Sequence, residues 1–445
     1  MKALEFDLRV MANDPGRRRN LMRVFAAALA AVDPEAAVKA ALVRKGDVLT
    51  LDERRLDLSE FERGVVLAFG KAAVPMARGI TSVLTGLPVD GVVASNNPES
   101  IDGLEVLRSS HPIPDSLSVD AARRLVENAS AAGPGDLVIV GVSGGGSALL
   151  TLPAAGIALD DLATTTGALL KCGATIDELN VVRRHLSAVK GGRLAETLAG
   201  AGAVLTLVIS DVVGDDLNVI ASGPMVPDPT TFADAMAVLD KYSIREEMPT
   251  AVVEHLLAGV TGEIDDTPDG GPLFDRQSIA LVATAADAAR GAADRARLLG
   301  WEPNVVTTTL VGEARDVAVR LAAESRDISA GQMLIYAGET TVTVAGDGTG
   351  GRNQELALAA SIELAGDDGV VLLSGGTDGI DGMSDAAGGL VDGHTEQRGR
   401  ALGLDAAAFL ARSDSNTYLS AVGDVIITGP TGTNVGDVLL VARSG

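Results

Sequence analysis

A run of three glycines flanked by serines is the stretch with the clearest capacity for chemistry. It follows an apolar segment, 137–142, and a second apolar segment comes after it. This pattern predicts a buried strand, a tight loop and a helix start, with Ser147 as the N-cap. Glycines let a ligand approach the backbone, and amides at a helix start offer unpaired donors, so we expect an anionic guest. The candidate binding residues are Ser143, Gly144, Gly145, Gly146 and Ser147.

Two familiar nucleotide-binding loops do not fit this stretch. The P-loop pattern needs a Lys followed by Ser or Thr where Ser147-Ala148 stands, and the dinucleotide pattern needs a glycine where Leu149 stands. The stretch is therefore either an anion-binding loop of another type or a turn that needs small residues for packing.

Cations are gathered at two places in a chain that otherwise avoids them. Lys71 directly follows a predicted strand over 63–69, a position where open α/β sheets bind ligands. A second cluster falls within eleven residues and suits a carboxylate or phosphate, the alternative being a helix face paired with acidic neighbours. The cluster consists of Arg183, Arg184, His185, Lys190 and Arg193.

Acidic residues follow the next buried strand, predicted over 203–210. The segment Asp211–Asp216 contains Asp211 and Asp215, separated by a glycine. Carboxylates at the end of a strand suit holding a hydrated magnesium ion or accepting a proton from a hydroxyl. Turn formation alone explains Gly214-Asp215 but explains the whole segment less easily.

Two glycine-rich turns occur in the second half of the chain. The turn 346–355 contains Arg352 and leads into a predicted helix over 356–364, which would place this arginine at a helix start where anions bind favourably. A strand over 370–374 then runs into glycines and two aspartates, Asp378 and Asp381.

The elements around these residues predict an α/β protein of more than one domain. The chain has 445 residues, 47% of them hydrophobic and only 2% aromatic, so Ala, Val, Leu and Ile must build the cores. Proline, glycine and aspartate concentrate between 245 and 277, which indicates a boundary there. We expect one domain over 1–245, a linker over 246–277 and a second domain over 278–445.

Acidic residues outnumber basic ones along the chain. Asp and Glu total 60 against 36 Lys and Arg, a formal charge of −24, and only seven of the 36 are lysines. So negative a field disfavours nucleic acid and anionic membranes as partners. This composition is typical of proteins from salt-loving organisms, in which salt screens the repulsion, although it also fits an acidic protein of high solubility.

The remaining composition points to a cytoplasmic protein. No apolar run has the length of a membrane span, and Met1–Leu8 contains no apolar region of a signal peptide. Cys172 is the only cysteine, which excludes an intrachain disulfide. A basic run, Arg17–Arg19, lies within a helix predicted over 14–42, and we interpret it as a solvent-exposed face.

Nine motifs in this order resemble the glycerate 2-kinase family, also called the MOFRL family and sometimes labelled hydroxypyruvate reductase. They cover most of the chain: Phe69-Gly-Lys71, His111-Pro-Ile-Pro-Asp115, Gly144-Gly-Gly-Ser-Ala148, Arg183–Arg193, Ser210–Pro224, Gly338-Glu-Thr-Thr341, Gly350-Gly-Arg-Asn-Gln-Glu355, Gly376-Thr-Asp-Gly-Ile-Asp-Gly382 and Thr428-Gly-Pro-Thr-Gly-Thr-Asn434. The resemblance implies an N-terminal Rossmann-like α/β domain, a C-terminal α/β domain and an active site in the cleft between them. It also implies transfer of a phosphoryl group from ATP, with Mg²⁺, to the 2-hydroxyl of D-glycerate, giving 2-phospho-D-glycerate and ADP.

The resemblance further implies roles for single residues. Lys71 and Arg352 would neutralise the transferred phosphoryl group, and Asp215, or as second choice Asp211, would act on the attacking hydroxyl. Asp211 or Asp378 would hold Mg²⁺. The implied substrate- and nucleotide-binding residues are Ser143, Gly144, Gly145, Gly146, Ser147, Lys190, Asn353, Glu355, Thr377, Asp378 and Asn434.

Some questions stay open at the level of sequence. Asp347 and Thr349 replace a basic residue common in the family, and Ala337 replaces a glycine, which puts the phosphate contacts of that loop in question. The glycine loop could receive either the glycerate carboxylate or an ATP phosphate. The alternative activity is an NAD(P)H-dependent hydroxypyruvate reductase, against which the missing dinucleotide pattern argues. The chain could act as a monomer or a homodimer.

Overall fold

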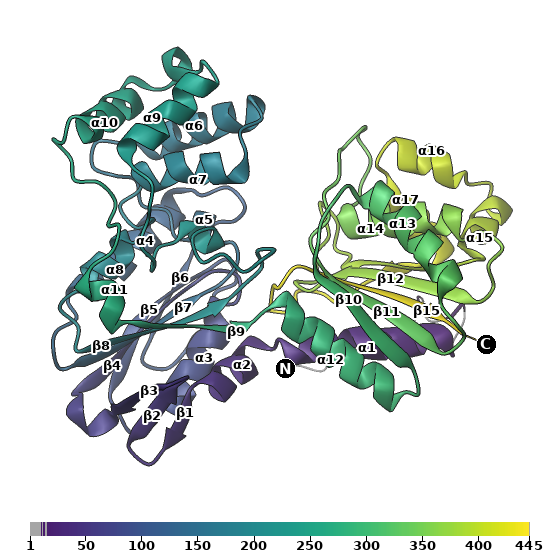
Figure 1. Cartoon of the computed structure of the whole chain (residues 1–445), viewed down its shortest axis with the longest axis horizontal. Coiled ribbons are helices and arrows are strands. Elements are labelled where there is room, and N and C mark those ends of the chain that lie inside the picture. The colour runs from purple at the N-terminus through teal and green to yellow at the C-terminus, as the bar shows by residue number, and fades with distance from the viewer. Residues whose placement is uncertain (1–9, 11, 14–15, 445) are drawn as a thin grey trace. The chain divides into compact units, whose positions relative to one another are not determined.

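The computed structural model describes residues 10, 12–13 and 16–444, which form two compact units. The unit that we call C-terminal comprises the N-terminal segment through Asp33, Ser210–Gly214 and Ala283–Gly445. The unit that we call N-terminal comprises Pro34–Ile209 and Asp215–Val282. Both units are α/β structures, as the composition predicts (Figure 1).

The units differ from the expected domains in two places. Helix α1 (Arg17–Ala31) belongs to the C-terminal unit, because its apolar side packs against that unit's helix α12 (Ala285–Leu298). The segment 246–277, expected to be a linker, belongs to the N-terminal unit, where α10 (Thr250–Val260) contributes to a core. Proline and glycine there mark loops within a unit rather than a boundary.

The N-terminal unit is built on a six-stranded sheet whose described neighbours β6 to β8 all run parallel. The spatial order reverses between β4 and β7, so that earlier strands lie to one side and later strands to the other. This is the doubly wound arrangement of a Rossmann-like fold, which confirms the prediction. In spatial order the strands are β6 (Glu105–Arg108), β5 (Val89–Ser95), β4 (Arg63–Phe69), β7 (Asp136–Val142), β8 (Ala203–Ile209) and β9 (Ser278–Ala283).

Helices and a small antiparallel sheet complete the N-terminal unit. Helices α3 (Ala73–Val83) and α4 (Ser116–Ser130) pack against the large sheet. A separate group of helices encloses an apolar core around Phe232: α6 (Leu159–Lys171), α7 (Ile176–His185), α9 (Phe232–Lys241) and α10 (Figure 1). The remaining elements are α2 (Pro34–Ala41), β1 (Val43–Lys45), β2 (Val48–Leu51), β3 (Arg54–Asp57), α5 (Gly146–Leu149), α8 (Arg193–Thr197), α11 (Pro272–Arg276) and the 3-10 helices η2 (Leu58–Glu60), η3 (Ile220–Ser222) and η4 (Arg245–Glu247).

The C-terminal unit contains a six-stranded mixed sheet with helices on both faces (Figure 1). Helices α1 and α12 cover one face, and α13 (Ala314–Asp327) and α14 (Arg352–Glu363) cover the other. In spatial order the strands are β10 (Glu302–Leu310), β11 (Gln332–Gly338), β15 (Asp437–Arg443), β12 (Val370–Gly376), β13 (Gly388–Asp392) and β14 (Val425–Ile426). Three further helices are α15 (Thr395–Ala401), α16 (Ala406–Ala411) and α17 (Ser415–Val422).

The register of this sheet gathers three loops at one edge. Strand β15 runs antiparallel to β11 and to β12, and its first residue, Asp437, pairs with Gly338 on one side and Gly376 on the other. Both glycines end their strands. The loops that follow β11 and β12 therefore begin beside Asp437, although they lie far apart in the sequence.

The interpretation of Arg17–Arg19 as an exposed face is wrong for Arg18. Its side chain is fully buried, with Nε 3.0 Å from Asp392 Oδ2 and Nη1 2.7 Å from Asp424 Oδ1. A buried arginine needs such carboxylate partners, since an unpaired buried charge is costly. The predicted helix over 14–42 is also interrupted after Ala31, and its expected start at residues 14–15 lies outside the described residues.

Across the described ranges, no helix combines the length and the apolar character that a membrane span requires.

Candidate functional site

The loops that follow β4 and β7 are hydrogen-bonded to each other at the point where the strand order of the N-terminal unit reverses. The amide of Lys71 donates to the Gly144 carbonyl at 2.9 Å, and the amide of Ser143 donates to the Phe69 carbonyl at 3.1 Å. Gly70 has φ +116°, and a Cβ there would overlap Ser143. This edge of a doubly wound sheet is where such folds bind ligands.

Lys71 lies beside the glycines and beside a loop histidine. Gly145 has φ +78°, and a Cβ there would lie 3.0 Å from Cδ2 of His111 and 3.3 Å from Cγ of Lys71. The structure therefore brings Lys71 and the glycine loop together, which the sequence analysis did not predict, and His111 is a neighbour of both.

The expected helix start is only partly realised. Gly145, not Ser147, is the N-cap residue, and its left-handed backbone explains why glycine is needed there. Helix α5 has four residues, and binding of an anion by this loop stays a prediction.

Ser147 instead joins a hydrogen-bonded chain of side chains. Its Oγ lies 3.0 Å from Ser222 Oγ, and Ser222 donates to Oδ1 of the buried Asn180 at 3.1 Å. Ser222 has φ +62°, a strained conformation for serine that holds η3 against α5. Asn180 lies on α7, so the chain connects the glycine loop to that helix.

Lys190 is anchored to the backbone of the same region. Its Nζ donates to the Ser147 carbonyl at 2.8 Å and to the Leu150 carbonyl at 3.1 Å. Burial, with a smaller contribution from the nearby Arg183, lowers the pKa of Lys190 to about 7. The structure thus brings together two of the predicted binding residues, Ser147 and Lys190.

The structure divides the predicted cation cluster into two classes. Arg184 donates to Asp228 at 2.8 Å, His185 Nε2 lies 3.0 Å from Asp266, and Arg193 donates to a backbone carbonyl at 3.2 Å. For Arg184 and His185 the alternative interpretation, a helix face paired with acidic neighbours, is confirmed, whereas Arg193 bonds to the backbone of Asp265.

Arg183 and Lys190 form the other class. Neither has a carboxylate partner among the residues that the structure describes. Burial lowers the pKa of the half-buried Arg183, which is the physical sign of a charge removed from water without compensation.

The two candidate bases differ in their surroundings. Asp211 Oδ2 accepts from the Asn434 amide at 2.9 Å, which joins two predicted site residues within the C-terminal unit. Asp215 belongs to the N-terminal unit and has φ +58°, which aspartate tolerates better than most residues. Its carboxylate forms no hydrogen bond or ion pair with the described part of the chain.

Arg352 is held by two carboxylates of its own unit. Its Nε and Nη2 lie 2.6 Å and 3.0 Å from the two oxygens of Asp437, and its Nη1 lies 2.7 Å from Glu339 Oε1. Burial alone would lower the pKa of Arg352, but Asp437 and Glu339 outweigh it and raise the pKa above its ordinary value. All three nitrogens of the guanidinium therefore face protein carboxylates, which the sequence interpretation did not foresee.

A carboxylate of the protein already occupies the start of α14. Asp381 accepts from the amides of Asn353 at 3.0 Å and Gln354 at 2.8 Å. The buried Asp381 is therefore an anion held at this helix start by two of its amides, and binding of a ligand anion there stays a prediction. Burial raises the pKa of Asp381, opposed in part by these amides.

Three more predicted binding residues serve the fold of the C-terminal unit. Asn353 donates to Asp437 at 2.9 Å, Glu355 accepts from Arg315 at 2.6 Å, and Thr377 donates to the Gly436 carbonyl at 2.7 Å. All three predicted residues are buried in the unit. They position the loops around Arg352, and direct contact with a ligand stays a prediction for them.

The residues present do not form a ready magnesium site. Among residues 10, 12–13 and 16–444, no group of three or more His, Cys, Asp or Glu side chains is arranged to hold a metal. Asp211 is engaged by Asn434, and Asp378 accepts from the Ile380 amide at 3.1 Å. Mg²⁺ in kinases needs only one or two carboxylates when nucleotide phosphates supply further oxygens, so either aspartate suits that shared arrangement.

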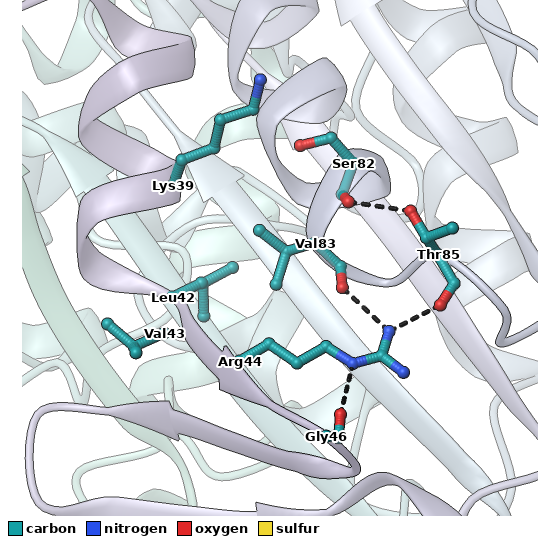
Figure 2. Close-up of a pocket in the computed structure, with 8 residues that line it drawn as sticks. All are labelled: Lys39, Leu42, Val43, Arg44, Gly46, Ser82, Val83 and Thr85. Atoms are coloured by element: carbon teal, nitrogen blue, oxygen red, sulfur yellow. Dashed lines mark hydrogen bonds between the residues drawn. The ribbon is translucent and has the colours of Figure 1, made fainter.

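A hollow with a defined lining lies elsewhere in the N-terminal unit. It has a volume of about 580 Å³ and is lined by residues of α2, β1 and the end of α3 (Figure 2). Arg44 within it donates to the carbonyls of Gly46, Val83 and Thr85, so the guanidinium closes the end of α3. The residues that line this hollow include no Asp or Glu, and we do not assign the chemistry to it.

The sequence analysis missed several residues around Arg352 and around the glycine loop. Glu339 and Asp437 were not proposed as site residues, although each directly follows a glycine. No local sequence pattern indicates a role for Ser222 or Asn180, because they are 42 residues apart in the chain and meet only in the folded structure.

Two family models match the chain. One is described as a domain of unknown function (DUF4147) and matches residues 20–257; the other is the MOFRL family and matches residues 332–437. A glycerate 2-kinase from Pyrococcus horikoshii is 39% identical, covering 94% of this chain and 96% of its own. A D-glycerate 2-kinase from Thermotoga maritima is 40% identical, covering 92% and 99%. A relative from Agrobacterium vitis, 39% identical and covering 97% and 95%, is provisionally named hydroxypyruvate reductase.

Two crystal structures share the fold. A glycerate kinase from Thermotoga maritima aligns with a TM-score of 0.83 at 38% identity, covering 96% of this chain and 99% of that one. A protein from Pyrococcus horikoshii aligns with a TM-score of 0.81 at the same identity and coverage.

Proposed function

We propose a function for this chain from the premise that it belongs to the glycerate 2-kinase family, whose members it matches over nearly its whole length. The chain would transfer the γ-phosphoryl group of ATP to the 2-hydroxyl of D-glycerate, releasing 2-phospho-D-glycerate and ADP. The observation that carries this proposal is the 39–40% identity to named glycerate 2-kinases over at least 92% of both chains.

The chemistry of such a transfer agrees with the residues described. Catalysis of phosphoryl transfer through a loose transition state depends mainly on positioning the reactants and neutralising charge. Lys71 and Arg352 would neutralise the charge of the transferred phosphoryl group. The substrate 2-oxygen would form a bond to phosphorus while the bond to the bridging oxygen of ADP breaks. Asp215 would take the hydroxyl proton, since its carboxylate has no partner among the described residues, unlike Asp211.

Arg352 can bind a phosphoryl oxygen only after one of its present carboxylate partners moves away. Its three nitrogens already face Asp437 and Glu339. Asp437 is fully buried, whereas the Glu339 side chain is 41% exposed, so Glu339 is the partner that a phosphoryl oxygen would displace. Bound Mg²⁺ would supply further neutralisation of phosphate charge, with Asp211 or Asp378 as its protein ligand.

The composition supports two further proposals. The excess of acidic residues, with only seven lysines, fits an enzyme that works at high salt in the cytoplasm of a salt-loving organism. Its substrates would be small molecules, with no nucleic acid or membrane involved.

A coupled assay tests the proposed function. The chain is mixed with D-glycerate, ATP and Mg²⁺ in molar KCl, with enolase present and phosphoglycerate mutase absent. Formation of phosphoenolpyruvate is expected, because enolase accepts the 2-phosphate and not the 3-phosphate. ATP consumption without phosphoenolpyruvate would indicate another acceptor position.

The second candidate is hydroxypyruvate reduction, which the provisional name of the Agrobacterium vitis relative favours. Leu149 stands where a dinucleotide loop would have its third glycine, which argues against it. Oxidation of NADH or NADPH by hydroxypyruvate, followed by its absorbance, with no ATP consumption in the first assay, would replace the kinase proposal by this one.

A further inference from the structure

Two cations beside the glycine loop lack an acidic partner in a strongly acidic protein. Arg183 and Lys190 lie close enough to repel each other, and no described Asp or Glu pairs with either. Lys190 is 6% exposed. With 60 acidic residues in the chain, leaving this pair uncompensated is costly unless another anion binds there.

The hydrogen bonds of the adjoining side chains have a defined direction. Asn180 Oδ1 is an acceptor, so the single hydroxyl hydrogen of Ser222 points to it. The hydroxyl of Ser147, 3.0 Å away, must then donate to Ser222. The lone pairs of Ser147 Oγ then have no donor among the described residues, so they can accept a hydrogen bond from a ligand hydroxyl.

Helix α7 holds Arg183 in place. Leu179, Val182 and Leu186 pack into the apolar core of the helical group. Arg183 is three residues after Asn180, one turn along the same side of the helix, and so lies near the serine chain. Arg184, the next residue, is bound to Asp228 instead.

We propose that Arg183, Lys190 and Ser147 form the binding site for the acceptor substrate, a 2-hydroxycarboxylate. Arg183 and Lys190 bind its carboxylate, and Ser147 accepts a hydrogen bond from one of its hydroxyls. This assignment rests on the proposed function, and it settles which ligand the glycine loop region receives.

The number of available donors favours a carboxylate over the phosphates of ATP. Two of the three Nζ hydrogens of Lys190 are used by the carbonyls of Ser147 and Leu150. One remaining ammonium hydrogen and the planar fork of Arg183 match the two oxygens of a carboxylate. A triphosphate carries more charge than this pair balances, and it has no hydroxyl to donate to Ser147.

The test compares Arg183→Gln with Arg123→Gln, a control that removes an exposed arginine of the same unit whose partner is Asp120. Loss of a charge-assisted contact is expected to raise the KM for D-glycerate roughly 10- to 100-fold, with the KM for ATP within about twofold. Binding of D-glycerate alone, measured by calorimetry, is expected to weaken equally. The control is expected to match the wild type, and Arg183→Lys is expected to restore part of the affinity.

The outcomes separate this proposal from the proposed function. A wild type that fails to phosphorylate glycerate overturns the function. An active wild type with unchanged glycerate KM and binding in Arg183→Gln overturns only the carboxylate site, and weakened ATP binding in its place would assign the pair to a phosphate. A merely structural role is tested by urea unfolding: since Arg183 has no acidic partner to lose, Arg183→Gln is expected to be no less stable than the wild type.

Discussion

Arg352 and Asp437 form a two-pronged ion pair at the edge of the C-terminal sheet, with Nε 2.6 Å from Oδ2 and Nη2 3.0 Å from Oδ1. Asp437 begins β15 between the last residues of β11 and β12, and Arg352 begins α14. The pair therefore fixes the arginine against the central strands and leaves Nη1 to the more exposed Glu339.

The two carboxylates on Arg352 are expected to differ in their contribution to stability. Asp437→Asn leaves a partly buried arginine without its main partner and weakens the contact to Asn353, which should cost about 2–4 kcal/mol. Glu339→Gln should cost less than about 1 kcal/mol, because the Glu339 side chain is 41% exposed. Urea unfolding of both variants measures this. Equal losses would contradict the assignment of Glu339 as the displaceable partner.

Arg352→Ala is expected to abolish most of the turnover. Removal of an arginine that neutralises a transferring phosphoryl group typically costs about 10³-fold or more in kcat. The matched control is Arg320→Ala on α13, whose side chain is 50% exposed and pairs with Glu324. Steady-state kinetics with D-glycerate and ATP distinguish the two variants, and near-normal turnover in Arg352→Ala would remove this arginine from the mechanism.

Asp215→Asn is expected to lower kcat by about 10²- to 10⁴-fold if its carboxylate accepts the hydroxyl proton. Asp216→Asn serves as the control, because Asp216 is exposed and only accepts a turn hydrogen bond from the Asn218 amide. Asp211→Asn tests the second choice. A larger kcat loss for Asp211→Asn than for Asp215→Asn would reverse the assignment of the base.

The stability of the protein is expected to depend on pH through Lys190. Its pKa is about 7 in the folded chain and has an ordinary value of 10.5. Below pH 7 both states carry the proton and the cost of burying the charge is fully present. Between pH 7 and 10.5 the unfolded state binds more protons, so the free energy of unfolding rises with pH through this group.

Lys190→Met isolates this contribution. The unfolding free energy of the wild type minus that of the variant is expected to rise between about pH 7 and 10 in urea titrations. Lys171→Met, which removes an exposed lysine of the same unit, is expected to show no such trend. A constant difference for Lys190→Met across this range would show that the lysine is not desolvated as described.

Local patterns in the sequence were sufficient to predict the α/β class and the buried strands. Nearly continuous apolar runs such as 137–142 and 203–209 form buried parallel strands because both faces of such a strand are covered. Lys71 and the glycine loop were each predicted to follow a buried strand, and they lie together because the carboxyl ends of the neighbouring parallel strands β4 and β7 meet at one edge of the sheet.

The partners of charged side chains could not be predicted in the same way. Arg18 and Arg183 both belong to short runs of cations, yet Arg18 is buried between Asp392 and Asp424 and Arg183 has no described acidic partner. Arg352 was placed correctly at a helix start, but Asp437, 85 residues further along the chain, already binds it.

The sequence by itself determined the α/β class, the two glycine turns and the residue types that handle anions, because these depend on periodicity and on backbone conformation within a few residues. Only the tertiary structure decided that Asp381 closes the start of α14, that α1 belongs with the C-terminal unit, and which cations lack a counter-charge. The physical reason is that burial and ion pairing bring together residues that are far apart in the chain. The energies of these interactions depend on which residues are in contact in the folded structure and not on their spacing in the sequence.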